Sequence, residues 1–190
     1  MRTLFSIVEQ PPEIPGLTYL RQYITEQQES ELAAVIDVAP WDTSWDRRRQ
    51  PYGASYGREG NAGQAIPAWG VALADRMHRE GLSDRPFDQM LVNEYLPGQG
   101  IALHLDHKPF DHVVVSLSLL APCVMDFRHV ENDRRESLLL EPQSLLVLRD
   151  EARYKWQHGI ARRKNDRWRG MVIRRARRLS VTFRLLRQTV

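Results

Sequence analysis

The sequence predicts an α+β fold that is mainly β, with N-terminal helices packed on one side of an antiparallel sandwich or barrel. Two observations support this class. Apolar residues recur at helical spacing in two segments before Pro86, and they follow a period of two in short segments after it. The chain has 190 residues, of which 42% are hydrophobic, and this is enough for one domain with a core.

Each of the two helices has a recognisable start and stop signal. Thr25 is expected as the N-cap of a helix over Glu26–Val38, and Pro40 ends that helix. Pro67 suits the first turn of a second helix, which Gly81 follows as a C-cap. The apolar side chains of this second helix recur at every fourth position: Trp69, Leu73 and Met77.

Eight segments after Pro86 fit short strands, because their apolar residues follow a period of two. They are Met90–Tyr95, Ile101–Asp106, Val113–Leu120, Cys123–His129, Ser137–Leu140, Ser144–Arg149, Tyr154–His158 and Leu179–Leu186. Because no repeat or low-complexity segment interrupts the chain, we expect residues 1–190 to form a single domain, with the helices in residues 1–85 and the β core in residues 86–190.

The composition favours a soluble, cytoplasmic protein. The apolar runs, such as Val113–Leu120, are far too short to span a bilayer. The apolar stretch within Met1–Val8 is too brief for a secretory signal. Cys123 is the only cysteine, which excludes an internal disulfide framework and a multi-cysteine zinc site and indicates a reducing compartment.

The charge is concentrated at the C-terminal end. Residues 161–190 hold eleven Lys and Arg and one acid, a balance of +10, whereas residues 1–160 sum to −7. Such a segment favours a polyanionic partner, because Lys and Arg displace the counterions of phosphate groups. A solvated charged strand and loop would explain the same charge equally well.

The tripeptide His104-Leu105-Asp106 is a candidate metal site. In a strand, its imidazole and its carboxylate share one face. With His158 as the third ligand, they would form a two-histidine, one-carboxylate triad, which binds Fe(II) on one side and leaves positions open for a 2-oxo acid and dioxygen. The alternative is a surface histidine beside a turn aspartate, since His-x-Asp occurs often by chance.

The strand around Ser180 carries polar side chains on one face and apolar side chains on the other. If the apolar face packs against helices, the polar face points inward, where guanidinium groups are costly without anionic partners. A small dicarboxylate such as 2-oxoglutarate would satisfy them. The alternative is an edge strand with solvated arginines. The polar face consists of Arg178, Ser180, Thr182 and Arg184.

Asn93 and Tyr95 share one face of the strand that precedes His104. Pro97-Gly98 then makes a turn into the next strand. An amide and a phenol suit a wall that binds a carboxylate, although a simple hairpin would also explain this segment.

Taken together, these segments resemble the AlkB family of Fe(II)- and 2-oxoglutarate-dependent dioxygenases. The resemblance rests on the order Asn-x-Tyr, His-x-Asp, a distant His and Arg-x-Ser-x-Thr-Phe-Arg, and it covers roughly residues 47–184. Within the family, several stretches are most similar to the branch that hydroxylates modified wobble uridines in tRNA. These stretches are Asn93–Ile101, Val115–Leu119, Val124–Phe127 and Arg153–Ile160.

The resemblance implies a double-stranded β-helix (jelly-roll) core with Fe(II) inside, a 2-oxoglutarate co-substrate and dioxygen. It implies that residues 1–85 include a nucleotide-recognition lid beside the helices. The implied iron ligands are His104, Asp106 and His158. The implied 2-oxoglutarate site consists of Asn93, Tyr95, Arg178, Ser180 and Arg184.

The implied activity is oxidative demethylation of N-alkylated bases in single-stranded DNA or RNA. One alternative is hydroxylation of a wobble-uridine side chain in tRNA. Others are an oxygenase that acts on protein side chains, a catalytically silent nucleic-acid-binding module, and a sugar-binding or cupin-like barrel. We expect a monomer with no membrane partner.

Four residues are candidates for substrate contact. The segment Arg47–Gly53 resembles the family's arginine-rich approach to the lid, and tyrosines in and after it can stack on a flipped base. An arginine of the basic C-terminal segment would contact backbone phosphates. The alternative for Tyr52, and for Trp45 nearby, is packing of the lid onto the barrel. The candidates are Arg48, Tyr52, Tyr56 and Arg175.

Overall fold

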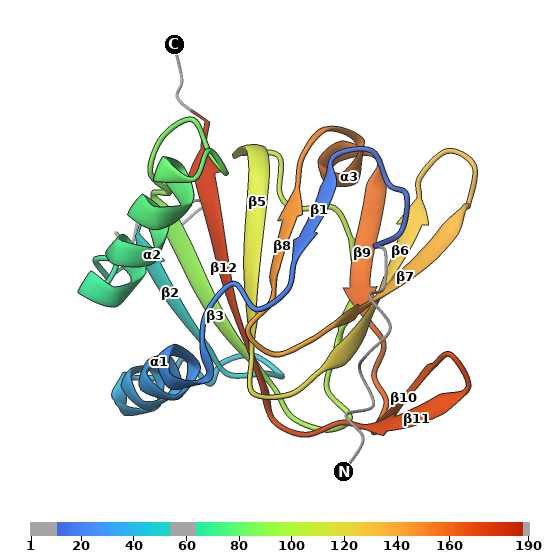
Figure 1. The fold of residues 1–190 in the computed structure, drawn as a ribbon, viewed down its shortest axis with the longest axis horizontal. Helices are drawn as coiled ribbons and strands as arrows, with labels where there is room; N and C mark the ends of the chain where they lie inside the picture. Colours follow the sequence, from blue (N-terminus) through green and yellow to red (C-terminus); the bar gives the residue numbers. More distant parts are fainter. Residues whose placement is uncertain (1–10, 54–63, 188–190) are drawn as a thin grey trace.

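The computed structural model describes residues 11–53 and 64–187, and their fold is mainly β (Figure 1). The strands are β1 Leu17–Leu20, β2 Arg49–Gly53, β3 Gln89–Tyr95, β4 Ile101–His104, β5 Phe110–Leu119, β6 Cys123–His129, β7 Arg135–Leu140, β8 Leu145–Leu148, β9 Trp156–Ile160, β10 Asn165–Trp168, β11 Met171–Arg174 and β12 Arg178–Leu186. The helices are α1 Glu26–Val38, α2 Ala68–Arg79 and α3 Asp150–Tyr154.

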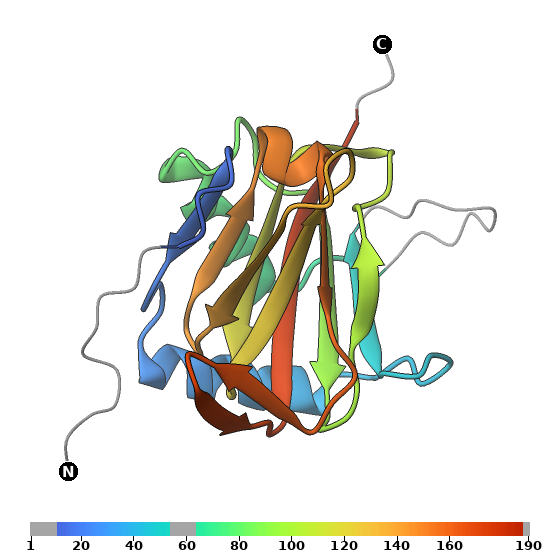
Figure 2. The same ribbon diagram turned by 90° about the vertical axis from the view of Figure 1, so that its right-hand side faces the viewer.

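Two antiparallel sheets face each other, and a two-stranded ribbon extends from one end (Figures 1 and 2). The larger sheet has the strand order β1-β8-β5-β12-β3-β2, and the smaller sheet has the order β4-β9-β6-β7. The ribbon consists of β10 and β11. The prediction of a mainly β, antiparallel fold is therefore confirmed.

Strand β12 lies in the middle of the larger sheet and separates two environments. Its apolar side chains, such as Val181 and Phe183, are fully buried in one cluster with Ile36 of α1 and Met77 of α2. Figure 1 shows both helices on the outer side of this sheet. A second apolar cluster, which includes Phe127, lies on the side of the smaller sheet. The polar face of β12 is therefore turned towards the space between the sheets.

The two predicted helices are confirmed. The Thr25 hydroxyl accepts a hydrogen bond from the Gln28 amide, and the Gln28 side chain accepts one from the Thr25 amide, so that α1 begins with a capping box. Helix α2 begins directly after Pro67. None of the helices in the described part of the chain has the length and apolar character needed to cross a membrane.

The strands differ from prediction at several places. Strand β4 ends at His104, so Asp106 lies in the following loop. The predicted strand Tyr154–His158 is displaced, because its first residue closes helix α3 and β9 starts at Trp156. Residues 1–85 also contribute β1 and β2 to the larger sheet. The bounds of β1, β2 and the two strands of the ribbon could not be predicted from the sequence, because all four are short and lack a clear apolar alternation.

Candidate active site

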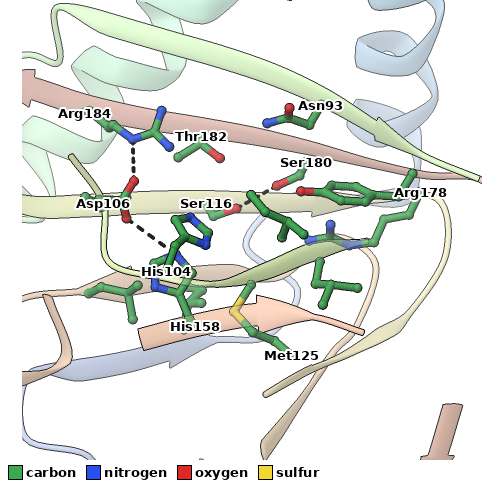
Figure 3. A pocket seen from close by; sticks show the side chains of 16 residues that line it. Asn93, His104, Asp106, Ser116, Met125, His158, Arg178, Ser180, Thr182 and Arg184 are labelled. Atoms are coloured by element: carbon green, nitrogen blue, oxygen red, sulfur yellow. Dashed lines mark hydrogen bonds and ion pairs between the residues drawn. The ribbon is translucent and has the colours of Figure 1, made fainter. Parts of the chain in front are cut away.

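A cavity lies between the two sheets and combines a polar wall with an apolar one (Figure 3). The polar face of β12 provides one side, and β3, β5, β8 and the smaller sheet provide the rest. The lining residues are Asn93, Tyr95, Ile101, His104, Asp106, Val114, Ser116, Met125, Leu146, Leu148, His158, Ile160, Arg178, Ser180, Thr182 and Arg184.

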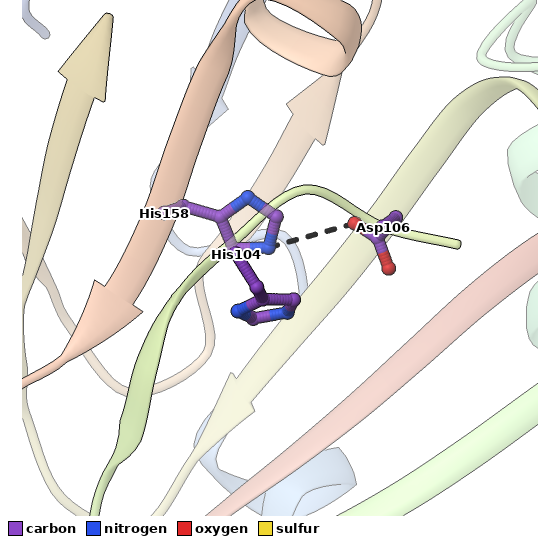
Figure 4. Close-up of side chains that lie close together, drawn as sticks. All are labelled: His104, Asp106 and His158. Atoms are coloured by element: carbon purple, nitrogen blue, oxygen red, sulfur yellow. Dashed lines mark ion pairs between the residues drawn. The ribbon is translucent and has the colours of Figure 1, made fainter. Parts of the chain in front are cut away.

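His104, Asp106 and His158 come together at one end of this cavity (Figure 4). The two histidines are direct partners in the antiparallel pairing of β4 with β9. One ligand atom from each residue can be chosen so that all three lie within 4.8 Å of one another. The sequence predicted that Asp106 shares a strand face with His104. In the structure β4 ends at His104, and the loop that follows carries the Asp106 carboxylate to the histidines.

The carboxylate of Asp106 is held asymmetrically. Its Oδ1 accepts a hydrogen bond from Arg184 Nε at 2.9 Å. Its buried Oδ2 lies 3.5 Å from His158 Nε2 and has no hydrogen-bond partner among the described residues. Burial alone would raise the pKa of Asp106, but Arg184 and His158 outweigh it and hold that pKa below its usual value. Oδ2 is thus an ionised, unpartnered oxygen that faces an imidazole, as a metal ligand requires.

The histidines are suited to the same role. Burial lowers the pKa of His158 to about 4, so this imidazole is neutral at pH 7 and its ring nitrogen can donate a lone pair. His104 Nδ1 lies 2.9 Å from the backbone oxygen of Ala102, a contact that fixes the orientation of its ring. The three side chains therefore fit a divalent iron ion.

A buried arginine fastens the loop that carries Asp106. Arg153 of α3 donates hydrogen bonds to the backbone oxygens of Asp106, His107, Phe110 and Asp111, at 3.1 to 3.2 Å. Because a guanidinium offers five donors in a rigid plane, one side chain fixes the whole turn from the end of β4 to the start of β5.

Arg178 has the properties of an anion-binding residue. It is only 2% exposed, and its Nη2 donates to Ser118 Oγ at 2.7 Å. Its Nε and Nη1 are buried without a hydrogen-bond partner in the described parts of the chain. An unpaired buried guanidinium is costly, and the carboxylate of a bound co-substrate would supply an anionic acceptor. The site therefore fits a carboxylate-bearing co-substrate as well as a metal.

The other predicted 2-oxoglutarate residues also line the cavity. The hydroxyl of Ser180 lies 2.9 Å from that of Ser116, and Asn93 and Tyr95 lie on the neighbouring strand. Arg184 faces the cavity but bonds to Asp106 and, at 3.2 Å, to Gln89 Oε1. In this structure Arg184 therefore supports the Asp106 carboxylate of the candidate iron site, in addition to any contact with a co-substrate.

The predicted substrate residues do not come together at the cavity. Arg48 forms two hydrogen bonds with Glu94, the residue after Asn93 on β3, and Glu94 does not line the cavity. Tyr52 is 7% exposed and belongs to the cluster on the helical side of the larger sheet. Arg175 is buried and binds both oxygens of Asp166. The structure thus pairs or buries these three side chains away from the cavity, and their contact with substrate stays a prediction. Tyr56 lies outside the described residues.

Some residues around the site were not selected from the sequence. Ser116 lines the cavity and Ser118 bonds to Arg178, and their alternation within an otherwise apolar strand was a readable signal. Met125 also lines the cavity, but it looks like an ordinary strand residue. Arg153 could not be selected from the sequence, because its role depends on hydrogen bonds with a loop more than 40 residues away in the chain.

Comparison with known proteins places these features in a family. Residues 16–184 match the 2OG-Fe(II) oxygenase superfamily. The Arabidopsis thaliana protein named Alkylated DNA repair protein ALKBH8 homolog is 32% identical, over 96% of this chain and 61% of that protein. The Macaca fascicularis tRNA (carboxymethyluridine(34)-5-O)-methyltransferase ALKBH8 is 32% identical, over 92% of this chain and 31% of that protein. The chain thus spans less than two thirds of either relative.

A solved structure shares the fold. The structure of OsALKBH1 matches with a TM-score of 0.69 at 20% identity, and the match covers 90% of this chain and 98% of that one.

Proposed function

Because the chain belongs to the 2OG-Fe(II) oxygenase superfamily, we propose that it oxidatively demethylates N-alkylated bases in single-stranded DNA or RNA. It is a dioxygenase that uses Fe(II), 2-oxoglutarate and dioxygen, as this superfamily does. The substrate class is the proposed step. The observation that carries it is an exposed basic surface on the ribbon of β10 and β11, next to the elements that bear the site.

In this proposal, His104, Asp106 and His158 hold the iron, and the cavity wall around Arg178 holds 2-oxoglutarate. The loaded site supplies hydroxylation of a C–H bond, coupled to conversion of 2-oxoglutarate into succinate and carbon dioxide. Arg184 keeps the Asp106 carboxylate ionised and correctly turned. On an N-methyl group, the hydroxylated product is a hemiaminal, which loses formaldehyde and leaves the base demethylated.

The ribbon presents a positively charged outer face. The pairing of Asn165 with Arg174 and of Arg167 with Val172 puts these four side chains on one face of β10 and β11. All four are exposed, and Val172 is 66% exposed. Two guanidiniums beside an apolar side chain suit a nucleic-acid strand, because arginine contacts phosphates and apolar surface contacts sugars and bases.

The base of the ribbon is fixed to the catalytic elements. The side chain of Arg175 donates to the backbone oxygens of Gln99 and Ala161, which lie before β4 and directly after β9. The Gly98 amide donates to the backbone oxygen of Arg163. A strand bound along the ribbon would therefore be held next to the strands that carry His104 and His158. The name of the Arabidopsis relative, which refers to repair of alkylated DNA, agrees with this substrate class.

The test is an aerobic incubation of the protein with Fe(II), ascorbate and 2-oxoglutarate. Methylated single-stranded DNA, methylated RNA and bulk tRNA are offered in parallel, and succinate and digested nucleosides are measured by mass spectrometry. We expect loss of a methyl mark with a matching amount of succinate. Succinate with every nucleoside unchanged would overturn the nucleic-acid substrate and favour a protein substrate. Iron-loaded protein that forms no succinate would favour a silent binding module.

A second candidate is hydroxylation of a wobble-uridine side chain in tRNA. The specific observation in its favour is the similarity to the macaque tRNA methyltransferase ALKBH8, which covers 92% of this chain. The same assay separates the candidates, because a new hydroxylated nucleoside in tRNA alone would support this one.

A further inference from the structure

Three consecutive arginines precede and begin β2, and among the described residues two of them have an acidic partner. Arg48 pairs with Glu94, and Arg49 pairs with Asp42 at 2.8 Å. Arg47 instead donates from Nε to the side-chain oxygen Oδ1 of Asn93, at 3.2 Å. No carboxylate in the described part of the chain pairs with Arg47. Among the described side-chain hydrogen bonds of these three arginines, the one to a cavity residue is that of Arg47.

We propose that Arg47 is a positioning residue for 2-oxoglutarate, which turns the amide of Asn93 so that its NH₂ group faces the co-substrate. This inference rests on the proposed assignment of Asn93 and Arg178 to 2-oxoglutarate.

The direction of the Asn93 amide follows from hydrogen-bond chemistry. A guanidinium can only donate, so the amide atom that faces Arg47 is the oxygen. Asn93 is buried and lines the cavity, so its NH₂ group remains as a donor on the cavity side. Without Arg47, the amide could rotate and present its oxygen, which would repel a carboxylate.

The guanidinium groups of Arg47 and Arg178 both lie near the ring of Tyr95, a residue of the cavity wall. The guanidinium carbons of Arg47 and Arg178 lie 5.5 Å and 5.4 Å from the centroid of the Tyr95 ring. Tyr95 is part of the cavity wall, so the Arg47 side chain contacts two residues of that wall, Asn93 and Tyr95.

The residue before Arg47 is tied to the opposite side of the cavity. The backbone oxygen of Asp46 accepts a hydrogen bond from Gln99 Nε2 at 2.6 Å, and its carboxylate pairs with Arg162. Gln99 precedes β4 and Arg162 follows β9, the two strands that carry the histidines. These contacts join the residue before Arg47 to the segments that flank β4 and β9, while Arg47 itself bonds to Asn93 of β3.

The experiment measures the binding of 2-oxoglutarate by calorimetry, without oxygen and with Mn(II) in place of Fe(II). The variants are Arg47→Ala, Arg47→Lys, Asn93→Ala and the double variant Arg47→Ala with Asn93→Ala. Arg49→Ala serves as the matched control, because Arg49 lies in the same segment but pairs with Asp42.

We expect Arg47→Ala to weaken binding about tenfold, as loss of a charge-assisted contact predicts. Arg47→Lys should stay within about threefold of Arg47→Ala, because lysine keeps the charge but has no planar Nε–H. The double variant should bind no more than about twofold more weakly than Asn93→Ala, because Arg47 acts through Asn93. In turnover, the KM for 2-oxoglutarate should rise by the same factor, with kcat reduced less than about twofold.

Two results would overturn the inference. Arg47→Ala that binds 2-oxoglutarate like the parent protein would show that Arg47 has no such role. Fully additive losses in the double variant would show that Arg47 acts directly by its charge and not through the amide. Failure of the assignment on which the inference rests is distinguishable, because in that case Asn93→Ala itself would bind 2-oxoglutarate like the parent protein. Failure of the nucleic-acid substrate would leave 2-oxoglutarate binding in this assay unchanged.

Discussion

Two buried arginines should respond in opposite ways to the same substitution. Arg178 is 2% exposed, makes one hydrogen bond to Ser118 and leaves two donor atoms unpaired among the described residues. Arg153 is 3% exposed and donates to four backbone oxygens. Replacement of each by Met keeps most of the side-chain volume and removes the charge.

For Arg178→Met, the structure predicts a more stable protein. Each unsatisfied buried donor destabilises the folded protein by about 1–3 kcal/mol, so removal of two donors raises the free energy of unfolding by about 2–6 kcal/mol. The lost bond to Ser118 costs about 1.5–3 kcal/mol. The net expectation is an increase of about 2 kcal/mol in the free energy of unfolding. For Arg153→Met, four carbonyl oxygens lose their donor, and we expect a decrease of at least about 3 kcal/mol.

The assay is urea unfolding with and without 2-oxoglutarate. A ligand at one hundred times its Kd stabilises the protein that binds it by about 2.7 kcal/mol, so the parent should gain about this amount and Arg178→Met nothing. If Arg178→Met is less stable than the parent by more than about 1 kcal/mol in the absence of 2-oxoglutarate, the unpaired state of this guanidinium is refuted. A neutral Arg153→Met would refute the description of the Asp106 loop.

Three further predictions concern the iron site and the ribbon. Asp106→Ala should weaken binding of Mn(II) or Fe(II) at least about a hundredfold in calorimetry, and it should reduce the free energy of unfolding by about 3–5 kcal/mol because a buried guanidinium loses its anion. Burial lowers the pKa of His158 to about 4, so as the pH falls this imidazole is protonated in the unfolded chain before it is protonated in the folded protein. The free energy of unfolding of the metal-free protein, measured in urea, should therefore decrease as the pH falls from 6.5 to about 4. His158→Gln should not show this decrease. The double variant Arg167→Gln with Arg174→Gln should reduce the slope of log affinity against log salt by about 1.4 for single-stranded RNA. The control Arg135→Gln, at the start of β7, should leave this slope unchanged.

The elements that the sequence predicted best are those in which a local pattern of side chains is enough to specify the structure. In β12, side chains alternate between an apolar cluster and a polar cavity, so the period of two is complete from Arg178 to Leu185. Helix α1 has a capping box that its local sequence already contains. The three residues of the candidate triad could be selected from the sequence because coordination chemistry restricts the residue types of such a triad.

The roles that the sequence did not predict depend on partners that a local pattern does not specify. Arg175 looks like a phosphate-binding residue in a basic segment, but it is bonded to Asp166, the one acid of that segment. Arg48 shares its residue type with Arg47, yet only Arg47 contacts a residue of the cavity. A count of charges cannot separate such neighbours, because the pairing is decided by which residues the sheet brings opposite each other.

The ribbon of β10 and β11 is a separable module. It lies between β9, which carries His158, and β12, which carries Arg178, and its root is a fully buried carboxylate, Asp166, bound by Arg163 and Arg175. The part of the ribbon beyond Asp166 could be lengthened, shortened or changed in sequence without moving the proposed iron ligands or Arg178. If the ribbon binds the nucleic acid as proposed, the architecture separates the evolution of partner choice from the evolution of chemistry. A grafted ribbon should then change the substrate that is bound without changing the reaction.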